Sequence, residues 1–491
     1  MKRVFAWGLL CSLSLGWIAN WATANPLYQE HCARCHGVER LGGIGPALLP
    51  DSLQRLKPEQ AAGVIAKGRS ATQMPEFAST LNPAQIQELV TYIYSPLPLP
   101  IWDEAAIKAS HQRLYTPDPQ QKPVFSGDPL NLFVVVESGD HHISIVDGDS
   151  QQVLRRFPTH FALHGGAKYS PDGRLVYLAS RDGWISVYDL YALQLVAEIR
   201  AGINTRNLAL SADGRFVLVG NYLPHTLVLL DARDLSLIKL IPAQTAPNPS
   251  SRVSAVYQAA PRHSFIIALK DQPEAWELDY TQPDFPIHRL ALKAVLDDFL
   301  FDPDYRYLMG ADRQNQQGQV LDLALGKPIA TLPLAGMPHL GAGITWDYQG
   351  QAVLVTPNLQ QPQITVIEMA HWTVLKQIPT LGPGFFLRSH DNTPYAWADV
   401  FSGPNKDTMQ IIDKRTLEVV RTLKPEPGKA LGHVEFSRNG DYAWVSLWEN
   451  DGAILIYDAK TLTEVKRLPM SKPSGKYNVY NKITLSRGTS H

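Results

Sequence analysis

Beyond residue 130 the chain repeats one arrangement of hydrophobic and polar positions. Each copy contains an apolar run, a polar turn and a second apolar run that ends in aspartate, as in "GRLVYLASRDGWISVYDL" and "DYAWVSLWENDGAILIYD". About 41 to 48 residues separate the starts of successive copies, close to the length of a four-stranded propeller blade. The eight copies begin near residues 132, 175, 216, 264, 307, 353, 395 and 442. The pattern therefore predicts an all-β, eight-bladed β-propeller over residues 131–491.

The first 24 residues have a different pattern. Lys2 and Arg3 precede a continuous apolar run, which ends in the small residues of "ATA" at positions 22–24. This order is typical of a secretory signal peptide, so we expect export and a mature chain that begins near Asn25. The alternative is an uncleaved membrane anchor, because the run is close to the ~18 residues that span a bilayer. Cleavage at this site would remove the apolar run and leave no transmembrane segment.

The mature chain would keep two cysteines, because Cys11 lies in the leader. Residues 32–36 read Cys-Ala-Arg-Cys-His, the signature of covalent haem attachment. We expect thioether bonds from Cys32 and Cys35 to haem c and iron coordination by His36. A redox-active dithiol is the alternative. Because haem of this type is attached after export in bacteria, the motif and the leader together predict the periplasm.

Met74 is the candidate for the sixth iron ligand. A thioether ligand is expected for an electron-transfer haem of high potential, and Met74 precedes a proline in "QMPEF" as in small class I c-type cytochromes, which this segment resembles. His31 is the competing ligand. The other role open to Met74 is burial in the core of the domain.

The segment "NPAQIQELVTYIYSPL" predicts a helix that closes this first domain. Asn82 is a suitable N-cap and Pro83 fits the first turn. Apolar residues then recur at helical spacing, at Ile86, Leu89, Val90 and Ile93. A stiff linker begins at Pro96, Pro98 and Pro100. We therefore expect a small all-α class I c-type cytochrome over residues 25–97 and a linker over residues 98–130.

The charge balance limits the possible partners. The chain has 45 basic and 46 acidic residues and a formal net charge of −1 at pH 7. Such a balance favours neither nucleic acid nor an anionic membrane surface as a partner.

Three stretches carry a resemblance that covers both domains. They are "HISIVDGDSQQV", "SPDGRLVYLASRDGWISVYDL" and "RLPMSKPSGKYNVYNKITLSR". With the fused cytochrome, they resemble the haem d1 proteins of denitrifying bacteria, a family that includes cytochrome cd1 nitrite reductase and its relatives in haem d1 assembly. The resemblance implies that the propeller binds a d1-type haem.

The same resemblance implies a binding site for this tetrapyrrole. His164, in "FALHGGAKYSPDGR", matches the proximal iron ligand of the reductase. Arg181, Arg206 and Arg252 match arginines that hold the cofactor's carboxylates, a task that suits the fixed fork of a guanidinium.

Departures from the reductase pattern indicate a different reaction. His339 matches one of the two distal histidines that handle nitrite, but Asp297 stands at the position of the other. The reductase also carries an N-terminal arm, and the few residues between the predicted cleavage site and the haem motif leave no room for such an arm. Conversely, His433 has no counterpart in the reductase, and with Tyr477 it is a candidate general base, because imidazole titrates near neutral pH. We take His433, Tyr477 and His339 as the candidate catalytic residues.

The resemblance therefore favours an oxidoreductase of haem d1 assembly, which oxidises a propionate side chain of dihydro-haem d1 to an acrylate and passes electrons to the haem c. The product would pass to nitrite reductase in a transient complex, and a soluble carrier would reoxidise the protein. Three alternatives stay open: a cytochrome cd1 nitrite reductase, a non-catalytic haem d1 carrier, and a general propeller–cytochrome electron carrier.

Overall fold

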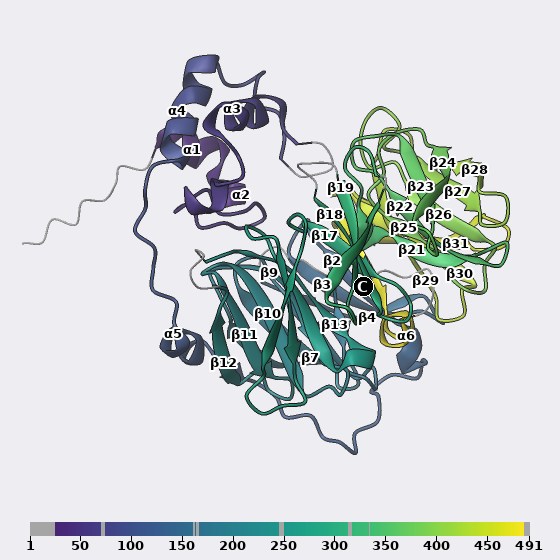
Figure 1. The fold of residues 1–491 in the computed structure, drawn as a ribbon. Coiled ribbons are helices and arrows are strands. Elements are labelled where there is room, and N and C mark those ends of the chain that lie inside the picture. The colour runs from purple at the N-terminus through teal and green to yellow at the C-terminus, as the bar shows by residue number, and fades with distance from the viewer. Residues whose placement is uncertain are drawn as a thin grey trace, which may run out of the picture.

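The structure is a computed structural model that describes residues 25–69, 74–160, 163, 166–244, 250–312, 317–332 and 334–485. The predicted signal peptide and the predicted iron ligand His164 lie outside the described residues. A small helical unit at the N-terminus lies against one end of a ring of β-sheets (Figure 1). No helix in the described ranges is long and apolar enough to cross a membrane.

The N-terminal unit folds around the apolar face of its last helix. Its helices are α1 (Pro26–His31), α2 (Ala33–His36), the 3-10 turn η1 (Asp51–Leu53), α3 (Pro58–Lys67) and α4 (Pro83–Ile93). The predicted closing helix is confirmed as α4, since Asn82 caps it and the Gln85 side chain returns a hydrogen bond to the Asn82 amide. The buried side chains of α4 are those that the spacing predicts, namely Ile86, Leu89, Val90 and Ile93.

The segment between the two units is fixed to the propeller. It contains α5 (Glu104–Ala109), the short strand β1 (Gln112–Arg113) and the 3-10 turn η2 (Pro129–Asn131). Trp102 donates a hydrogen bond to the Arg200 carbonyl at 3.2 Å and stacks against the Arg200 guanidinium. Strand β1 adds a fifth strand to one blade through β8. This segment is therefore part of the packed structure and not a bare spacer.

Eight antiparallel sheets form the propeller, which confirms the predicted fold. From the channel outward, blades 1 to 4 are β33 (Pro473–Asn478), β2 (Leu132–Glu137), β3 (His142–Asp147), β4 (Gln152–Pro158); β5 (Lys168–Tyr169), β6 (Leu175–Ala179), β7 (Trp184–Asp189), β8 (Gln194–Arg200); β9 (Asn204–Leu210), β10 (Phe216–Leu223), β11 (Thr226–Asp231), β12 (Leu237–Pro242); and β13 (Val253–Ala259), β14 (Ser264–Leu269), β15 (Glu274–Asp279), β16 (Ile287–Ala291).

Blades 5 to 8 follow in the same order. They are β17 (Asp298–Phe301), β18 (Tyr307–Asp312), β19 (Gln317–Asp322), β20 (Lys327–Leu332); β21 (Ile344–Tyr348), β22 (Gln351–Pro357), β23 (Gln363–Glu368), β24 (Thr373–Pro379); β25 (Leu387–Arg388), β26 (Tyr395–Asp399), β27 (Met409–Asp413), β28 (Glu418–Leu423); and β29 (Leu431–Phe436), β30 (Tyr442–Leu447), β31 (Gly452–Asp458), β32 (Glu464–Met470). Turns η3 (Ala260–Arg262) and η4 (Leu340–Ala342) and helix α6 (Val479–Thr484) complete the chain.

The ring closes because the last strand joins the first blade. Strand β33 pairs with β2, with Tyr477 opposite Val134. This pairing completes the first blade with the last strand and so holds the two ends of the propeller together. Blades 2 and 6 are four positions apart in a ring of eight, so the loops that enter β5 and β21 face each other across the channel. The first loop carries His164 in the sequence and the second carries His339.

Candidate functional site

The haem attachment motif consists of Cys32 and the short helix α2, directly after α1. His36 is buried, and its Nδ1 lies 2.7 Å from the Pro46 carbonyl oxygen, which fixes the ring and leaves Nε2 as the nitrogen for iron. A Cβ at Gly45 would lie 2.5 Å from the His36 ring, so the close approach of this loop requires glycine. Cys32 and Cys35 are not joined by a disulfide, and burial raises the pKa of Cys32 to about 11. A redox-active dithiol needs a lowered pKa instead, so the arrangement fits covalent haem.

Met74 lies at the edge of the same unit. Its side chain packs against the cytochrome core, and its carbonyl oxygen accepts a hydrogen bond from the Arg69 amide at 3.1 Å. His31, the competing ligand, contacts Phe77 edge to face and lies 3.8 Å from Glu30. Iron coordination by Met74 stays a prediction.

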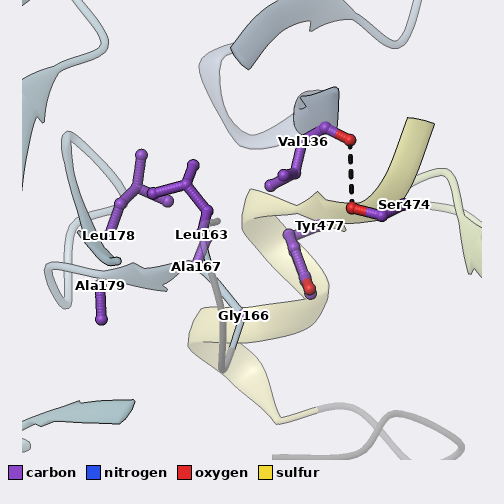
Figure 2. Close-up of a pocket in the computed structure, with 8 residues that line it drawn as sticks. All are labelled: Val136, Leu163, Gly166, Ala167, Leu178, Ala179, Ser474 and Tyr477. Carbon is purple, nitrogen blue, oxygen red and sulfur yellow. Dashed lines mark hydrogen bonds between the residues drawn. The ribbon is translucent and has the colours of Figure 1, made fainter. Parts of the chain in front are cut away.

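The mouth of the propeller channel contains a small cavity. Figure 2 shows Tyr477 pointing between the strand β33 that carries it and the loop that precedes β5. The lining residues are Val136, Leu163, Gly166, Ala167, Leu178, Ala179, Ser474 and Tyr477. Leu163 and Gly166 flank position 164 in the sequence, and iron coordination by His164 stays a prediction.

Tyr477 is held in a narrow slot with its hydroxyl toward the cavity. A Cβ at Gly475 would lie 2.4 Å from the hydroxyl oxygen, and one at Gly166 would lie 3.2 Å from the ring. The Tyr477 carbonyl accepts a hydrogen bond from the Tyr169 hydroxyl at 2.8 Å. Within the described residues the Tyr477 hydroxyl has no hydrogen-bond partner. Burial raises its pKa to about 12, so it is a neutral phenol available to a ligand.

His433 lies directly behind Tyr477. The two rings meet edge to face with centroids 5.3 Å apart, and the Phe386 ring lies 4.7 Å from His433. His433 has a φ of 48° at a bulge in β29, a strained conformation for a non-glycine residue. Lys476 holds it there by donating to the His433 carbonyl and lying 3.3 Å from Nδ1. Burial, and then the charges of Lys476 and other cations, lower the pKa of His433 well below 6.5, so its imidazole is neutral.

His339 lies in the loop that enters blade 6, two blades from His433. It precedes η4, and its backbone amide donates to the Pro357 carbonyl at 3.0 Å. Its ring packs on Phe385, with centroids 4.3 Å apart, and its Nε2 lies 3.7 Å from Asp298 Oδ2. The Phe385–Phe386 pair connects His339 to His433, so ring contacts link the three candidate catalytic residues in one series.

Two buried charged residues near these histidines are not predicted by the sequence. Arg388 on β25 is 3% exposed, and among the described residues its guanidinium meets the carbonyls of Leu387 and Ala342 but forms no ion pair. Its Nε has no hydrogen-bond partner there. Asp399 accepts hydrogen bonds from the backbone amides at 385 and 386, and burial raises its pKa to about 6. No repeat or motif marks either residue.

The three predicted arginines lie together at the cytochrome end of the channel. Arg181 and Arg252 each lie about 6 Å from the centroid of the Tyr222 ring, at 5.8 and 5.9 Å. Arg206 donates to the Ser254 carbonyl at 2.9 Å. Burial alone would raise the pKa of Tyr222, but Lys270 and the three arginines lower it to about 7. The same concentration of positive charge, after burial, lowers the pKa of Arg181 to about 10.

Arg252 and Asp297 serve the contact between the two units. Arg252 forms a two-point ion pair with Asp271, and its Nη1 donates to the Ser52 carbonyl of the cytochrome. Arg55 of the cytochrome forms a two-point ion pair with Asp297, at 2.7 and 3.0 Å. Ala47 and Leu49 of the cytochrome also pack against Ile203 and Leu223. Asp297 thus binds the cytochrome.

Asp297→Asn should weaken this contact. The change would leave Arg55 and Lys270, which lies 2.9 Å from Asp297, without their carboxylate. Loss of one member of a buried ion pair is costly, so cleavage by trypsin in the segment after Pro100 should become about ten-fold faster or more. The exposed variant Asp441→Asn is the matched control. An unchanged cleavage rate would show that the ion pair does not secure the contact.

This contact has a defined pH dependence. The pKa of Asp297 is lowered below its ordinary value by Lys270 and Arg55, which outweigh its burial. The stabilisation is therefore complete at neutral pH and is lost only as pH falls through that lowered value.

The residues present fit both haem groups. The attachment motif offers two thiols and an oriented imidazole to a haem c. The channel offers an excess of buried cations, an Arg388 Nε without a partner in the described residues and a neutral phenol, all suited to a planar ligand that carries carboxylates.

Comparisons with known proteins agree with this geometry. The Cytochrome D1 heme domain family matches residues 127–482, and the family of Cytochrome C oxidase, cbb3-type, subunit III matches residues 19–93. The chain is 57% identical over 493 residues to the Dihydro-heme d1 dehydrogenase of Pseudomonas aeruginosa, covering 99% of each protein. Protein NirF of the same species is 32% identical over 72% of this chain and 92% of its own length.

Two further matches span both units. The Nitrite reductase of Stutzerimonas stutzeri is 24% identical over 96% of this chain and 97% of its own length. A solved structure of Dihydro-heme d1 dehydrogenase NirN in complex with DHE is 58% identical, with a TM-score of 0.80 over 93% of this chain and 99% of that one. The chain therefore belongs to the Cytochrome D1 heme domain family and, within it, to the dihydro-heme d1 dehydrogenases, which are oxidoreductases.

Proposed function

We propose that this protein catalyses a late step of haem d1 biosynthesis in the periplasm, the oxidation of a propionate side chain of dihydro-haem d1 to an acrylate. The observation that carries the proposal is the pairing of Tyr477 and His433 at the channel mouth, beneath a cytochrome attached to the same propeller. Identity of 57% to a dihydro-heme d1 dehydrogenase over nearly the full length supports it.

The reaction removes two hydrogens as two protons and two electrons. The substrate would stand in the channel between the His164 and His339 loops, with the reacting side chain at the Tyr477 hydroxyl. The Tyr477 hydroxyl would pass a proton from the reacting side chain to the neutral His433 behind it. Arg388 and the arginines would fix the carboxylates. Haem c, held by Cys32, Cys35 and His36, supplies an acceptor for one electron when bound, and the ferric iron of the substrate is the acceptor for the other. The second proton would leave to water.

The state of Asp297 favours this function over nitrite reduction. The carboxylate is engaged by Arg55 and Lys270 and is not available at the second distal position. The site therefore offers one distal histidine, His339. A transient complex with nitrite reductase, which would receive the product, and reoxidation by a soluble carrier are parts of the same proposal, as are export and cleavage of the signal peptide.

The direct test uses the purified ferric protein and dihydro-haem d1 under anaerobic conditions without nitrite. Extraction and mass spectrometry should show a product two hydrogens lighter than the substrate. Recovery of unchanged substrate from a bound complex would support a non-catalytic carrier. Formation of nitric oxide after addition of nitrite and a reductant, with the tetrapyrrole retained, would support a reductase.

His433→Gln should lower the rate of this conversion by about ten-fold. The effect is moderate because the lowered pKa of His433 makes it a weak base, and a weaker base contributes less to proton transfer. Affinity for the substrate should not change, since His433 does not line the cavity. The rate of a single turnover and the dissociation constant of the substrate are measured for His433→Gln and wild type. An unchanged rate would show that His433 takes no part in the reaction.

A further inference from the structure

A second cavity lies farther along the channel, toward α6 and away from the cytochrome. Its lining residues are Ala167, Lys168, Tyr169, Ala209, Leu210, Tyr257, Gln258, Lys482 and Leu485. The innermost strands contribute residues near their C-terminal ends, namely Ala209 and Leu210 of β9 and Gln258 of β13. The cytochrome lies at the opposite ends of these strands, near Asn204 at the start of β9 and Arg252 just before β13. Ala167 lines both cavities, so the two spaces adjoin.

Two lysines face this second cavity. Lys168 Nζ lies 5.7 Å from the centroid of the Tyr257 ring, and within the described residues it has no carboxylate or hydrogen-bond acceptor. Lys482 Nζ lies 5.6 Å from the centroid of the Tyr477 ring and 3.9 Å from Glu435 Oε2. The two lysines are close enough to influence each other's protonation.

The charges around the cavity do not balance. Glu435 of β29 already accepts hydrogen bonds from the Asn481 side chain and from the amide of residue 436. Arg388 of β25 adds a third cation that acts on Lys482. Burial is the main cause that lowers the pKa of Lys168 to about 8 and that of Lys482 to about 7. Two amines pointed into one enclosed space in this way suit an anionic ligand.

We propose that Lys168 and Lys482 form a carboxylate-binding subsite that holds an acidic side chain of the tetrapyrrole substrate and so positions the substrate against Tyr477. This inference rests on the proposed function for the identity of the substrate. Both lysines are positioning residues. The reacting carbon would lie at the Tyr477 hydroxyl, whereas Lys482 contacts the ring of Tyr477 and not the reacting carbon.

The placement of the two histidine loops supports this orientation. They enter blades 2 and 6, which face each other across the channel. A macrocycle whose iron lies between these loops must stand along the channel axis, so that one edge points toward the cytochrome and the other toward α6. The first edge would meet Arg181 and Arg206, and the second would bring its carboxylates to the lysines.

The test measures binding and not turnover. Dihydro-haem d1 is titrated anaerobically into the ferric full-length protein by absorbance, with wild type, Lys168→Met and Lys168→Arg. We expect the dissociation constant to rise about ten-fold or more in the methionine variant and to recover partly in the arginine variant. Lys460→Met, at an exposed turn, is the matched control. Melting temperature and the haem c spectrum show that each variant is folded.

Proton uptake adds a readout that a structural role would not change. The free lysines are partly neutral near pH 8, and a bound carboxylate favours their charged forms, so binding should take up protons and weaken from pH 7 to pH 9. Other groups that face them are Glu435, Arg388 and the tyrosines 169, 257 and 477, which are present in every variant.

The outcomes separate the two proposals. Equal affinity and equal proton uptake in wild type and Lys168→Met would refute the subsite and leave the dehydrogenation standing. Tight, lysine-dependent binding without conversion would refute the dehydrogenation and leave the subsite standing. A third outcome would also overturn the subsite. Lys168→Met would lose affinity at every pH, Lys168→Arg would not restore it, and the melting temperature would be lowered. Lys168 would then have a role in folding.

Discussion

Tyr477→Phe is expected to slow the oxidation of dihydro-haem d1 by about 100-fold or more, the range in which a positioned proton-transfer group acts. Tyr477 lines the cavity, and within the described residues its hydroxyl forms no hydrogen bond. Phenylalanine keeps the ring between Gly166 and Gly475, so the slot, the contact with Lys482 and the β33–β2 pairing should persist. Substrate affinity should therefore change little.

The measurement is a single turnover followed by mass spectrometry, beside a titration for affinity. Tyr480→Phe is the matched control, since Tyr480 lies on α6 and its ring contacts Arg438 outside the cavity. The rate should fall further in Tyr477→Phe than in His433→Gln, because Tyr477 lines the cavity and His433 lies behind it. Normal conversion by Tyr477→Phe would place the chemistry elsewhere in the channel.

Removal of the haem c attachment is expected to stop the reaction after substrate binding. In the double variant Cys32→Ala, Cys35→Ala no thioether can form, and the chain would lose its second electron acceptor. The propeller forms its own core of eight closed sheets, so affinity for dihydro-haem d1 should stay within about three-fold of wild type. Absorbance of the haem c, affinity and product yield are measured on the same samples.

Gly63→Ala is the control for damage to the cytochrome fold. Gly63 lies on α3, where a Cβ would meet nothing within 4 Å, so this variant should keep both haem c and activity. Full product formation by the variant without haem c, in the absence of any added oxidant, would show that the cytochrome is not an electron outlet for this reaction.

The repeat in the sequence predicted the blades because their middle strands are uniformly apolar. The predicted starts at 132, 175, 216, 264, 307, 395 and 442 fall at the second strand of a blade, where β2 and β14, for example, are buried at every position. In blade 6 this strand begins at Gln351, two residues before the predicted start. The innermost strands are less regular, and β5 and β25 have two residues each.

Much of the site lies on those innermost strands, which explains what sequence reasoning missed. Arg388 on β25 and Lys168 on β5 follow no hydrophobic alternation, and their importance comes from charges and cavities that only the closed ring brings together. The sequence indicates His433 because it departs from the nitrite reductase pattern. Lys476, which donates a hydrogen bond to the His433 carbonyl, does not depart from that pattern, so the sequence does not indicate it. The partner of Asp297 is Arg55, 242 residues away, which no local signal could reveal.

If the cytochrome accepts an electron from chemistry in the propeller channel, haem c reduction must accompany oxidation of the substrate. Ferric protein is mixed with dihydro-haem d1 in an anaerobic stopped-flow instrument, and haem c reduction and product formation are followed together. We expect one haem c per chain to become reduced at the rate at which the acrylate forms, and both signals to slow equally in Tyr477→Phe. Acrylate formation while haem c stays ferric, or haem c reduction without acrylate, would contradict this expectation.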